Sequence, residues 1–330
     1  MKIPETVLVA PDSFKGTLSS PQVAEAVAEG LTSAGRPVDV CPVADGGEGT
    51  MEVLVKALEG EVRRTRVSDP LGRPIMAPFG LCRVRRRLLG VIETAAASGL
   101  GLVGEDELDP LAASTRGTGE LMLAALTAGA EAICLGVGGS ATTDGGAGAI
   151  RAIRTGGGLG GASLTVLCDV RTPFEEAARV FGPQKGAGPE EVRRLTARLH
   201  RQARAMARDP RGRPFTGAAG GLSGGLWAEL GAELVPGASF VLDHLDFDAR
   251  MRDARAVVAG EGRLDEQSLA GKALSEVATR ARQRGVPCHA IVGRNELDSF
   301  GLRILDLQVV LQAGDPAAIA AAAEQLAAML

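Results

Sequence analysis

The sequence lacks the features that mark secreted and membrane proteins. Its five cysteines, at positions 41, 82, 134, 168 and 288, are scattered and form no CxxC pair. Such a set indicates reduced core thiols rather than a disulfide framework. The N-terminal segment MKIPETVLVAP has no long apolar stretch, and no later run reaches the length needed to cross a bilayer. We therefore expect a cytoplasmic protein.

Several motifs that would fix a chemistry are also absent. The sequence has no GxxxxGK[ST], so a nucleotide would not be held by a P-loop, and it has no GxSxG nucleophile elbow. The three histidines (His200, His244 and His289) are isolated and lack metal-ligand spacing. A formal charge of −4 gives no electrostatic case for nucleic acid or an anionic membrane. The expected partners are small molecules, with a homodimer as an open alternative.

Lysine is scarce, since only five of the 36 Lys and Arg residues are Lys. Three of these, Lys15, Lys185 and Lys272, have a glycine next to them. Where Arg is used almost everywhere, a Lys beside a glycine indicates a need for a compact point charge rather than a planar fork. Chance is the competing explanation for each of the three.

Glycine is abundant, with 45 residues in 330, and it is clustered. The segment Gly136–Gly148 (GVGGSATTDGGAG) lies between the apolar runs Ala132–Leu135 and Ala149–Ile153. A strand, a glycine-rich turn and a helix start direct backbone N–H groups and a helix dipole at one point, which suits phosphate. The loop also contains oxygen ligands of the kind that magnesium prefers, in Thr142, Thr143 and Asp144. The alternative is a plain, tight connection between strand and helix.

Carboxylates follow several other predicted strands, at Asp12, Asp45, Glu48, Asp169, Glu261 and Asp265. In open α/β sheets, ligands bind in the crevice beyond the carboxyl ends of the strands. A single Asp at such a position is usually a helix cap, but five such loops favour a metal and an acid/base partner. Phosphoryl transfer needs this mixture of cradle, metal, cations and carboxylate.

The order of elements predicts an α/β protein with two domains. Strand, acidic glycine loop and helix repeat at the start of the chain, which is typical of a parallel layer. Residues 61–92 instead alternate as short strands around the turn Asp69–Gly72, which indicates an antiparallel element. Because the late α/β units resemble the first ones, we predict a discontinuous domain of residues 1–68 and 245–330, with 69–244 inserted. The helix predicted from Pro189 to Arg208 has many arginines, interpreted as a solvated face.

Eight blocks occur in an order that resembles the bacterial type I glycerate kinases. They are APDSFKGTLS, PVADGGEGT, ETAAASGL, STRGTGEL, GVGGSATTDGGAGA, FGPQKGA with GAAGGL, and GEGRLDEQSLAGK. The resemblance implies transfer of the ATP γ-phosphoryl group to D-glycerate, on the 2-hydroxyl, with Mg²⁺. It also implies a Rossmann-like three-layer α/β/α domain with a parallel sheet, a second α/β domain with a mixed sheet, and a site between them. Compared with the family pattern, the chain is shorter between Ile150 and Leu164, from Arg171 to Val180, and after Gly293.

These observations together assign expected roles. The expected catalytic residues are Asp45, Lys15, Lys185 and Asp169. Substrate is expected to contact Arg116, Asp12, Ser98 and Glu48, with Arg116 taking the glycerate carboxylate as a bidentate partner. Nucleotide and phosphate are expected at Gly138, Gly139, Ser140, Thr142, Gly145, Gly146 and Lys272. The expected metal ligands are Asp144 and Asp265, although Asp144 is equally suited to bracing the loop.

Two alternative functions stay open. The segment Gly136–Ala141 also matches GxGxx(G/A), which is weak support for an NAD-dependent hydroxy-acid dehydrogenase. That alternative lacks a histidine in a glycine loop to act as proton donor. The second alternative is a non-catalytic protein that binds a nucleotide or a hydroxy acid.

Overall fold

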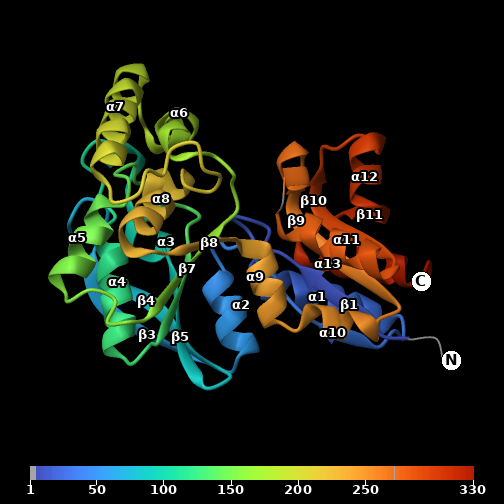
Figure 1. Ribbon diagram of the computed structural model, residues 1–330. Helices are drawn as coiled ribbons and strands as arrows, with labels where there is room; N and C mark the ends of the chain where they lie inside the picture. Colours follow the sequence, from blue (N-terminus) through green and yellow to red (C-terminus); the bar gives the residue numbers. More distant parts are fainter. Residues whose placement is uncertain (1–4, 271) are drawn as a thin grey trace. The chain divides into compact units, whose positions relative to one another are not determined.

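The structure is a computed structural model that describes residues 5–270 and 272–330. The chain forms two compact units, shown in Figure 1. Unit 1 contains the residues up to Asp45 and those from Ala238 onward, and unit 2 is Gly46–Gly237. The first unit is therefore built from both ends of the sequence, and the second is inserted between them.

Unit 1 contains a five-stranded sheet in the order β11-β10-β9-β1-β2, and every pair in it is parallel. The inner strand β1 is a fully buried apolar run, as expected where helices cover a parallel sheet. The strands are β1 (Val7–Pro11), β2 (Val38–Val40), β9 (Ala256–Leu264), β10 (Cys288–Asn295) and β11 (Leu307–Gln312). The helices are α1 (Ser20–Ser33), α9 (Gly237–His244), α10 (Phe247–Arg252), α11 (Ala273–Arg284), α12 (Ser299–Leu305) and α13 (Pro316–Ala327).

Helices α1 and α13 pack together over one face of this sheet. The apolar positions Val23, Val27 and Leu31 of α1, predicted from their i, i+4, i+8 spacing, are all buried. The two helices approach closely at Gly30, where a Cβ would lie 2.0 Å from the carbonyl oxygen of Ala320. The helix pair therefore closes the core of unit 1 and leaves the carboxyl ends of the strands for other contacts.

Unit 2 contains a six-stranded mixed sheet in the order β3-β4-β5-β6-β7-β8. The first three strands are antiparallel and the remaining pairs are parallel. The strands are β3 (Glu61–Ser68), β4 (Pro74–Val84), β5 (Arg87–Glu93), β6 (Ala132–Gly136), β7 (Ser163–Cys168) and β8 (Glu233–Pro236). The helices are α2 (Thr50–Ala57), α3 (Ala95–Ser98), α4 (Arg116–Thr127), α5 (Ala147–Thr155), α6 (Ala177–Phe181), α7 (Pro189–Ala205) and α8 (Ala218–Leu230).

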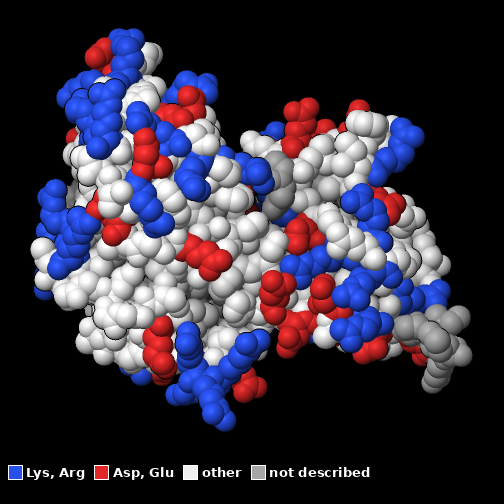
Figure 2. Space-filling view, in the orientation of Figure 1, with Lys and Arg blue, Asp and Glu red and all other residues white. Residues whose placement is uncertain are grey.

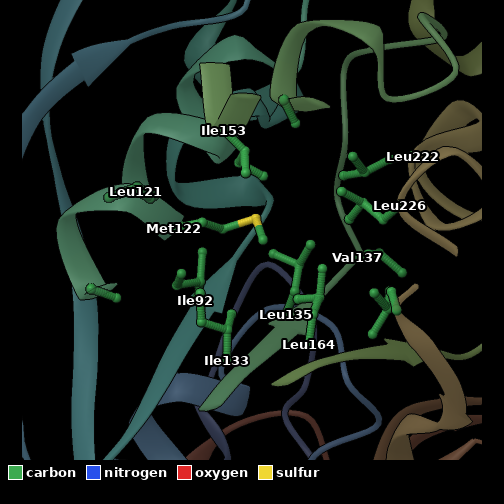
Figure 3. Close-up of a cluster of buried hydrophobic side chains, with 14 of the residues drawn as sticks. Ile92, Leu121, Met122, Ile133, Leu135, Val137, Ile153, Leu164, Leu222 and Leu226 are labelled. Atoms are coloured by element: carbon green, nitrogen blue, oxygen red, sulfur yellow. The ribbon is translucent and has the colours of Figure 1, made fainter. Parts of the chain in front are cut away.

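The core of unit 2 lies between this sheet and the helices α4, α5 and α8. Figure 3 shows how the side chains meet: Ile92, Ile133, Leu135 and Leu164 come from the strands, and the helices supply Leu121, Met122, Ile153, Leu222 and Leu226. Helix α2 packs against β4 and β5. The parallel strands β5, β6 and β7 are thus held rigidly, and the loops that follow them are positioned by a packed layer.

The predicted fold class is confirmed, with a parallel sheet in one unit and a mixed sheet in the other. One strand lies elsewhere than the sequence analysis had it. Residues 61–68 were assigned to the first domain, but β3 pairs along its whole length with β4, from Glu61 opposite Leu81 to Ser68 opposite Pro74, in the sheet of unit 2. Across the described residues, no helix is long and apolar enough to cross a membrane.

Candidate active site

The glycine-rich loop after β6 is the first part of the candidate site. It connects β6 to α5 in unit 2, as the sequence predicts. Its backbone lies directly on the Gly46–Gly49 loop, since a Cβ at Gly138 would lie 2.7 Å from the Gly47 Cα. Gly139 has φ +67°, and a Cβ there would lie 2.3 Å from Glu48 Oε1. Glycine is therefore required by close approach at one position and by backbone conformation at the next.

Lys185 is buried against this loop. Its side chain is only 2% exposed, although it carries an amine. The Nζ donates hydrogen bonds to Ser140 Oγ at 2.9 Å and to the Thr142 carbonyl oxygen at 2.6 Å. Burial lowers the pKa of Lys185 to about 7, against the partly compensating charge of Asp144. The site therefore holds an amine whose charge a bound anion would stabilise.

A cavity of about 280 Å³ joins Lys185 to the loop. It is lined by Gly138, Gly139, Ser140, Asp169 and Lys185, together with Leu100, Val137, Val170, Phe181, Gln184 and Ala219. Five sequence-predicted site residues thus meet in one place, drawn from the loop after β6, from the residue after β7 and from the short 3₁₀ turn Pro183–Lys185. The cavity combines backbone N–H groups, a hydroxyl, an amine and a carboxylate, which suits a phosphate group with its counter-ion.

Asp144 lies behind the loop and braces it. Its carboxylate accepts hydrogen bonds from the backbone N–H groups of Gly146 and Gly148, each at 3.0 Å. Thr115 donates to the same carboxylate from its backbone N–H at 3.0 Å and from its hydroxyl at 2.9 Å. With these donors on both oxygens, the geometry supports the bracing role of Asp144 over the metal-binding role.

The start of α8 supports the loop from another side. Residues Ala219, Gly220 and Gly221 all have positive φ, at 49°, 64° and 90°, and form a left-handed turn inside the helix. The carbonyl oxygen of Gly220 accepts from the Gly145 N–H at 3.1 Å, and a Cβ at Gly220 would lie 2.0 Å from the Thr142 carbonyl oxygen. Ala219 lines the cavity in a conformation that costs free energy for a residue with a Cβ, as is common at functional sites.

Unit 1 has a second cavity, of about 530 Å³, at the carboxyl ends of β1, β9, β10 and β11. It is lined by carboxylates and cations together: Asp12, Glu261 and Asp265 with Lys15, Arg263, Lys272 and Arg294. The remaining lining residues are Ser13, Phe14, Thr17, Gly262, Gly293 and Gly314. This is the crevice position at which α/β sheets bind ligands.

The carboxylates that line this crevice are perturbed by one another and by Asp45, which is not one of the lining residues. Burial and the charge of Asp45 raise the pKa of Asp12 well above its ordinary value. Asp45 is 2% exposed and accepts a hydrogen bond from Lys15 Nζ at 3.3 Å. Burial also raises the pKa of Glu261, although Lys272 Nζ donates to it at 2.9 Å. Carboxyl groups with such shifts in a cleft are candidates for acid/base chemistry.

Several predicted site residues lie outside both cavities. Arg116 is bonded to Glu120 at 2.7 Å with its side chain 67% exposed, and it borders a separate groove of about 470 Å³ between α4 and α5. Ser98 is fully buried and accepts from Thr118 Oγ1 at 2.8 Å. Gly145 faces Gln202 and Phe174, and Gly146 faces Leu222. The hydroxyl of Thr142 is buried and has no hydrogen-bond partner in the described part of the chain.

Two further carboxylates are Asp265 in unit 1 and Glu93 in unit 2. Asp265 accepts the backbone N–H of Gln267 at 2.9 Å and lies 3.5 Å from Arg263 and 4.0 Å from Lys272. Glu93, which the sequence analysis missed, ends β5 and accepts the Met51 N–H at 2.7 Å, at the start of α2. Burial, and to a lesser degree the charge of Glu48, raise the pKa of Glu93 to about 7. Its position at the end of a strand, in the block ETAAASGL, was the available signal.

A comparison with known proteins identifies the chain. The model of the glycerate kinase family matches residues 7–156 and 154–329. The chain belongs to the glycerate kinase family. A protein of Halalkalibacterium halodurans named glycerate kinase is 39% identical over 360 residues, which cover 94% of each chain. A protein of Escherichia coli K12 named glycerate 2-kinase is 39% identical over 325 residues, covering 87% of this chain and 84% of the relative.

A solved structure shares the architecture of this family member. The crystal structure of a Salmonella typhimurium LT2 protein described as a glycerate kinase 2 superposes with a TM-score of 0.85 at 35% identity. The match covers 99% of this chain and 98% of that one. The predictions of the family and of a kinase are therefore confirmed. The family match favours the kinase over the alternative of an NAD-dependent dehydrogenase.

Proposed function

We propose that the chain transfers the γ-phosphoryl group of ATP to D-glycerate, on the 2-hydroxyl, to give 2-phosphoglycerate and ADP. Family membership supports a kinase that uses ATP. The name of the Escherichia coli relative supports the 2-position. The observation that carries the proposal is Lys185, a buried amine that lines a cavity with a glycine-rich loop at the end of a parallel strand.

The residues of unit 2 are proposed to hold the phosphate. The backbone of Gly138 and Gly139 and the hydroxyl of Ser140 face the cavity and would bind phosphate oxygens. A bound phosphate would favour the charged form of Lys185, whose ammonium would then stabilise the charge on the transferring group. Phosphoryl transfer depends chiefly on such positioning and charge stabilisation.

The residues of unit 1 are proposed to handle the acceptor hydroxyl. Asp45 is buried and lies beside Lys15, so its carboxylate would orient the hydroxyl and accept its proton. Asp12, whose pKa is raised, would carry a proton and donate a hydrogen bond to glycerate. Lys15 and Lys272 would neutralise the carboxylate of glycerate and the phosphates of ATP. Arg116, bonded to Glu120, is not part of this proposal.

Magnesium is proposed to accompany the phosphates. No group of three or more His, Cys, Asp or Glu side chains able to hold a metal occurs among residues 5–270 and 272–330. Magnesium commonly takes one or two carboxylates and completes its shell with phosphate oxygens and water, so the residues present fit an ion that arrives with ATP. Asp169, in the Lys185 cavity, and Glu48, against Gly139, are the carboxylates proposed to hold it. Neutralisation of phosphate charge is what the ion supplies when bound.

The proposal is tested by phosphorus NMR of a mixture of the purified protein, ATP, Mg²⁺ and D-glycerate. We expect the signals of ADP and of 2-phosphoglycerate to grow together, because the spectrum reports turnover and the position of the new ester at once. Growth of 3-phosphoglycerate instead would overturn the regiochemistry. Binding of ATP and glycerate without any ADP would support the non-catalytic alternative and overturn the kinase activity of this chain.

A further inference from the structure

Helix α7 is rich in arginine, and one of its arginines contacts the backbone of unit 2 instead of solvent. Figure 2 shows Lys and Arg side chains crowded over this helix, and Arg193, Arg194, Arg201 and Arg204 are exposed as the sequence analysis expects. Arg198 is the exception. It is half-buried, and its guanidinium donates to two backbone carbonyl oxygens, that of Thr143 at 2.6 Å and that of Leu111 at 2.8 Å.

Side chains from one segment of the chain donate to successive carbonyl oxygens of the glycine-rich loop. Gln202, one turn after Arg198 on α7, donates from Nε2 to the Asp144 carbonyl oxygen at 2.9 Å. Lys185, in the turn that precedes α7, donates to the Thr142 carbonyl oxygen. Three successive carbonyl groups of the loop are therefore each held by a side chain from one segment of the chain.

This arrangement fixes how the loop presents its backbone. In a planar trans peptide, the carbonyl group and the following N–H point in opposite directions. Holding the carbonyl oxygens of residues 142–144 against α7 therefore sets the orientation of the next three N–H groups, of which that of Gly145 donates to the Gly220 carbonyl oxygen. It also fixes the stretch that follows Ser140, whose hydroxyl accepts from Lys185 in the cavity.

The donors belong to a packed segment rather than to a loose arm. A small hydrophobic cluster, separate from the main core of unit 2, holds it together: Phe174, Ala177, Ala178, Ala187, Leu195, Leu199 and Ala203. The same segment carries Lys185 between α6 and α7. The hydrogen bonds from α7 to the loop therefore also fix the position at which Lys185 contacts Ser140.

We propose that Arg198 is a positioning residue for phosphoryl transfer, which acts by holding the glycine-rich loop and Lys185 in register through its two carbonyl hydrogen bonds. The proposal rests on the phosphate-binding role proposed for this loop. A role in stability alone explains the geometry less well. The Nε of Arg198 is buried and finds no acceptor in the described part of the chain, and a buried donor without a partner lowers stability.

The test compares Arg198→Ala with Arg194→Ala, an exposed arginine on the same helix. ATP binding is measured by calorimetry without glycerate, so that the result does not depend on the acceptor. We expect the Kd for ATP to rise about 10-fold or more in Arg198→Ala, because two hydrogen bonds from a charged group are lost. Arg194→Ala should bind as the wild type does. Guanidinium ion at millimolar concentration should restore much of the affinity of Arg198→Ala.

Arg198→Lys adds a graded variant, since an ammonium replaces one carbonyl contact but not the planar pair. Its affinity should lie between those of the wild type and Arg198→Ala. Emission from Trp227, the only tryptophan, checks that unit 2 is folded. If wild type and Arg198→Ala bind ATP equally, or if a folded Arg198→Ala loses affinity that guanidinium does not restore, the positioning role is overturned. Failure of the wild type to bind ATP would instead overturn the proposed function.

Discussion

Replacing Lys185 with methionine is expected to separate activity from stability. Methionine keeps an unbranched apolar stem and removes the buried charge. The pKa of Lys185 falls from 10.5 to about 7 because its side chain is buried, and a difference of this size corresponds to about 5 kcal/mol. That free energy opposes folding whenever the amine is charged in the native state. The loss of hydrogen bonds to Ser140 and Thr142 partly offsets the gain, by about 1–3 kcal/mol.

The pH dependence of stability separates the effect of the Lys185 charge from the other effects of the substitution. Between the native pKa and the unfolded pKa of Lys185, the unfolded chain holds a proton that the native protein releases. The free energy of unfolding therefore rises with pH in this window, with a slope approaching about 1.4 kcal/mol per pH unit. From pH 7 to pH 9 the wild type should gain about 2 kcal/mol that Lys185→Met does not gain. Other groups titrate in both proteins, so the difference between the two curves carries the signal.

Urea unfolding at pH 7, 8 and 9, followed by Trp227 emission, measures this difference in unit 2. In parallel, the turnover of Lys185→Met should fall about 100- to 1000-fold, the usual effect of removing one preorganised donor from a reacting centre. If wild type and variant show the same pH dependence of stability, burial does not lower the pKa of Lys185 and this prediction is refuted. A variant with nearly full turnover would remove Lys185 from the chemistry.

Two further substitutions probe the proposed base and the glycine-rich loop. Asp45→Asn should lower kcat about 100-fold or more, because an amide cannot accept the hydroxyl proton, and it should leave the circular dichroism spectrum unchanged. Glu25→Gln, on the exposed surface of α1, is the control. Equal turnover of the wild type and both variants would exclude Asp45 as the base. Gly138→Ala should weaken ATP binding about 10-fold or more, because its Cβ meets the Gly47 backbone at 2.7 Å. Gly101→Ala, where a Cβ meets nothing within 4 Å, should bind ATP normally, and unchanged binding by Gly138→Ala would mean that the two loops are not fixed together.

Local signals carried much of the prediction. The apolar run before Gly136 predicts β6, and the glycines after it predict the turn that leads into α5. Both were predictable because glycine content, strand length and helix start are all properties of one short segment. Lys185 was detectable because lysine is rare in this chain and this one adjoins a glycine. Its burial against Ser140 was not detectable, since the two residues are 45 positions apart.

The features that sequence missed depend on contacts between distant segments. Arg198 is one of many arginines on a helix with the period of an amphipathic surface, and nothing local distinguishes it from Arg194. Arg116 stands in a family-like block, and its guanidinium is paired with Glu120, four residues later, so its contact with substrate stays a prediction. The strand at residues 61–68 was predicted, but the domain boundary was placed after it, because its alternating pattern suits either sheet and only pairing with β4 decides between them.

The energetics of Lys185 give a separate argument for an anion in the cavity. An apolar side chain of similar volume would avoid the cost of a buried amine, and isolated buried charges destabilise proteins. Yet the structure holds Lys185 in place with two hydrogen bonds, beside a left-handed turn in which Ala219 adopts a costly conformation. Two unfavourable features at one cavity are expected where the surrounding structure is organised for a ligand rather than for its own stability. A phosphate group removes the first of them, because its charge stabilises the protonated amine.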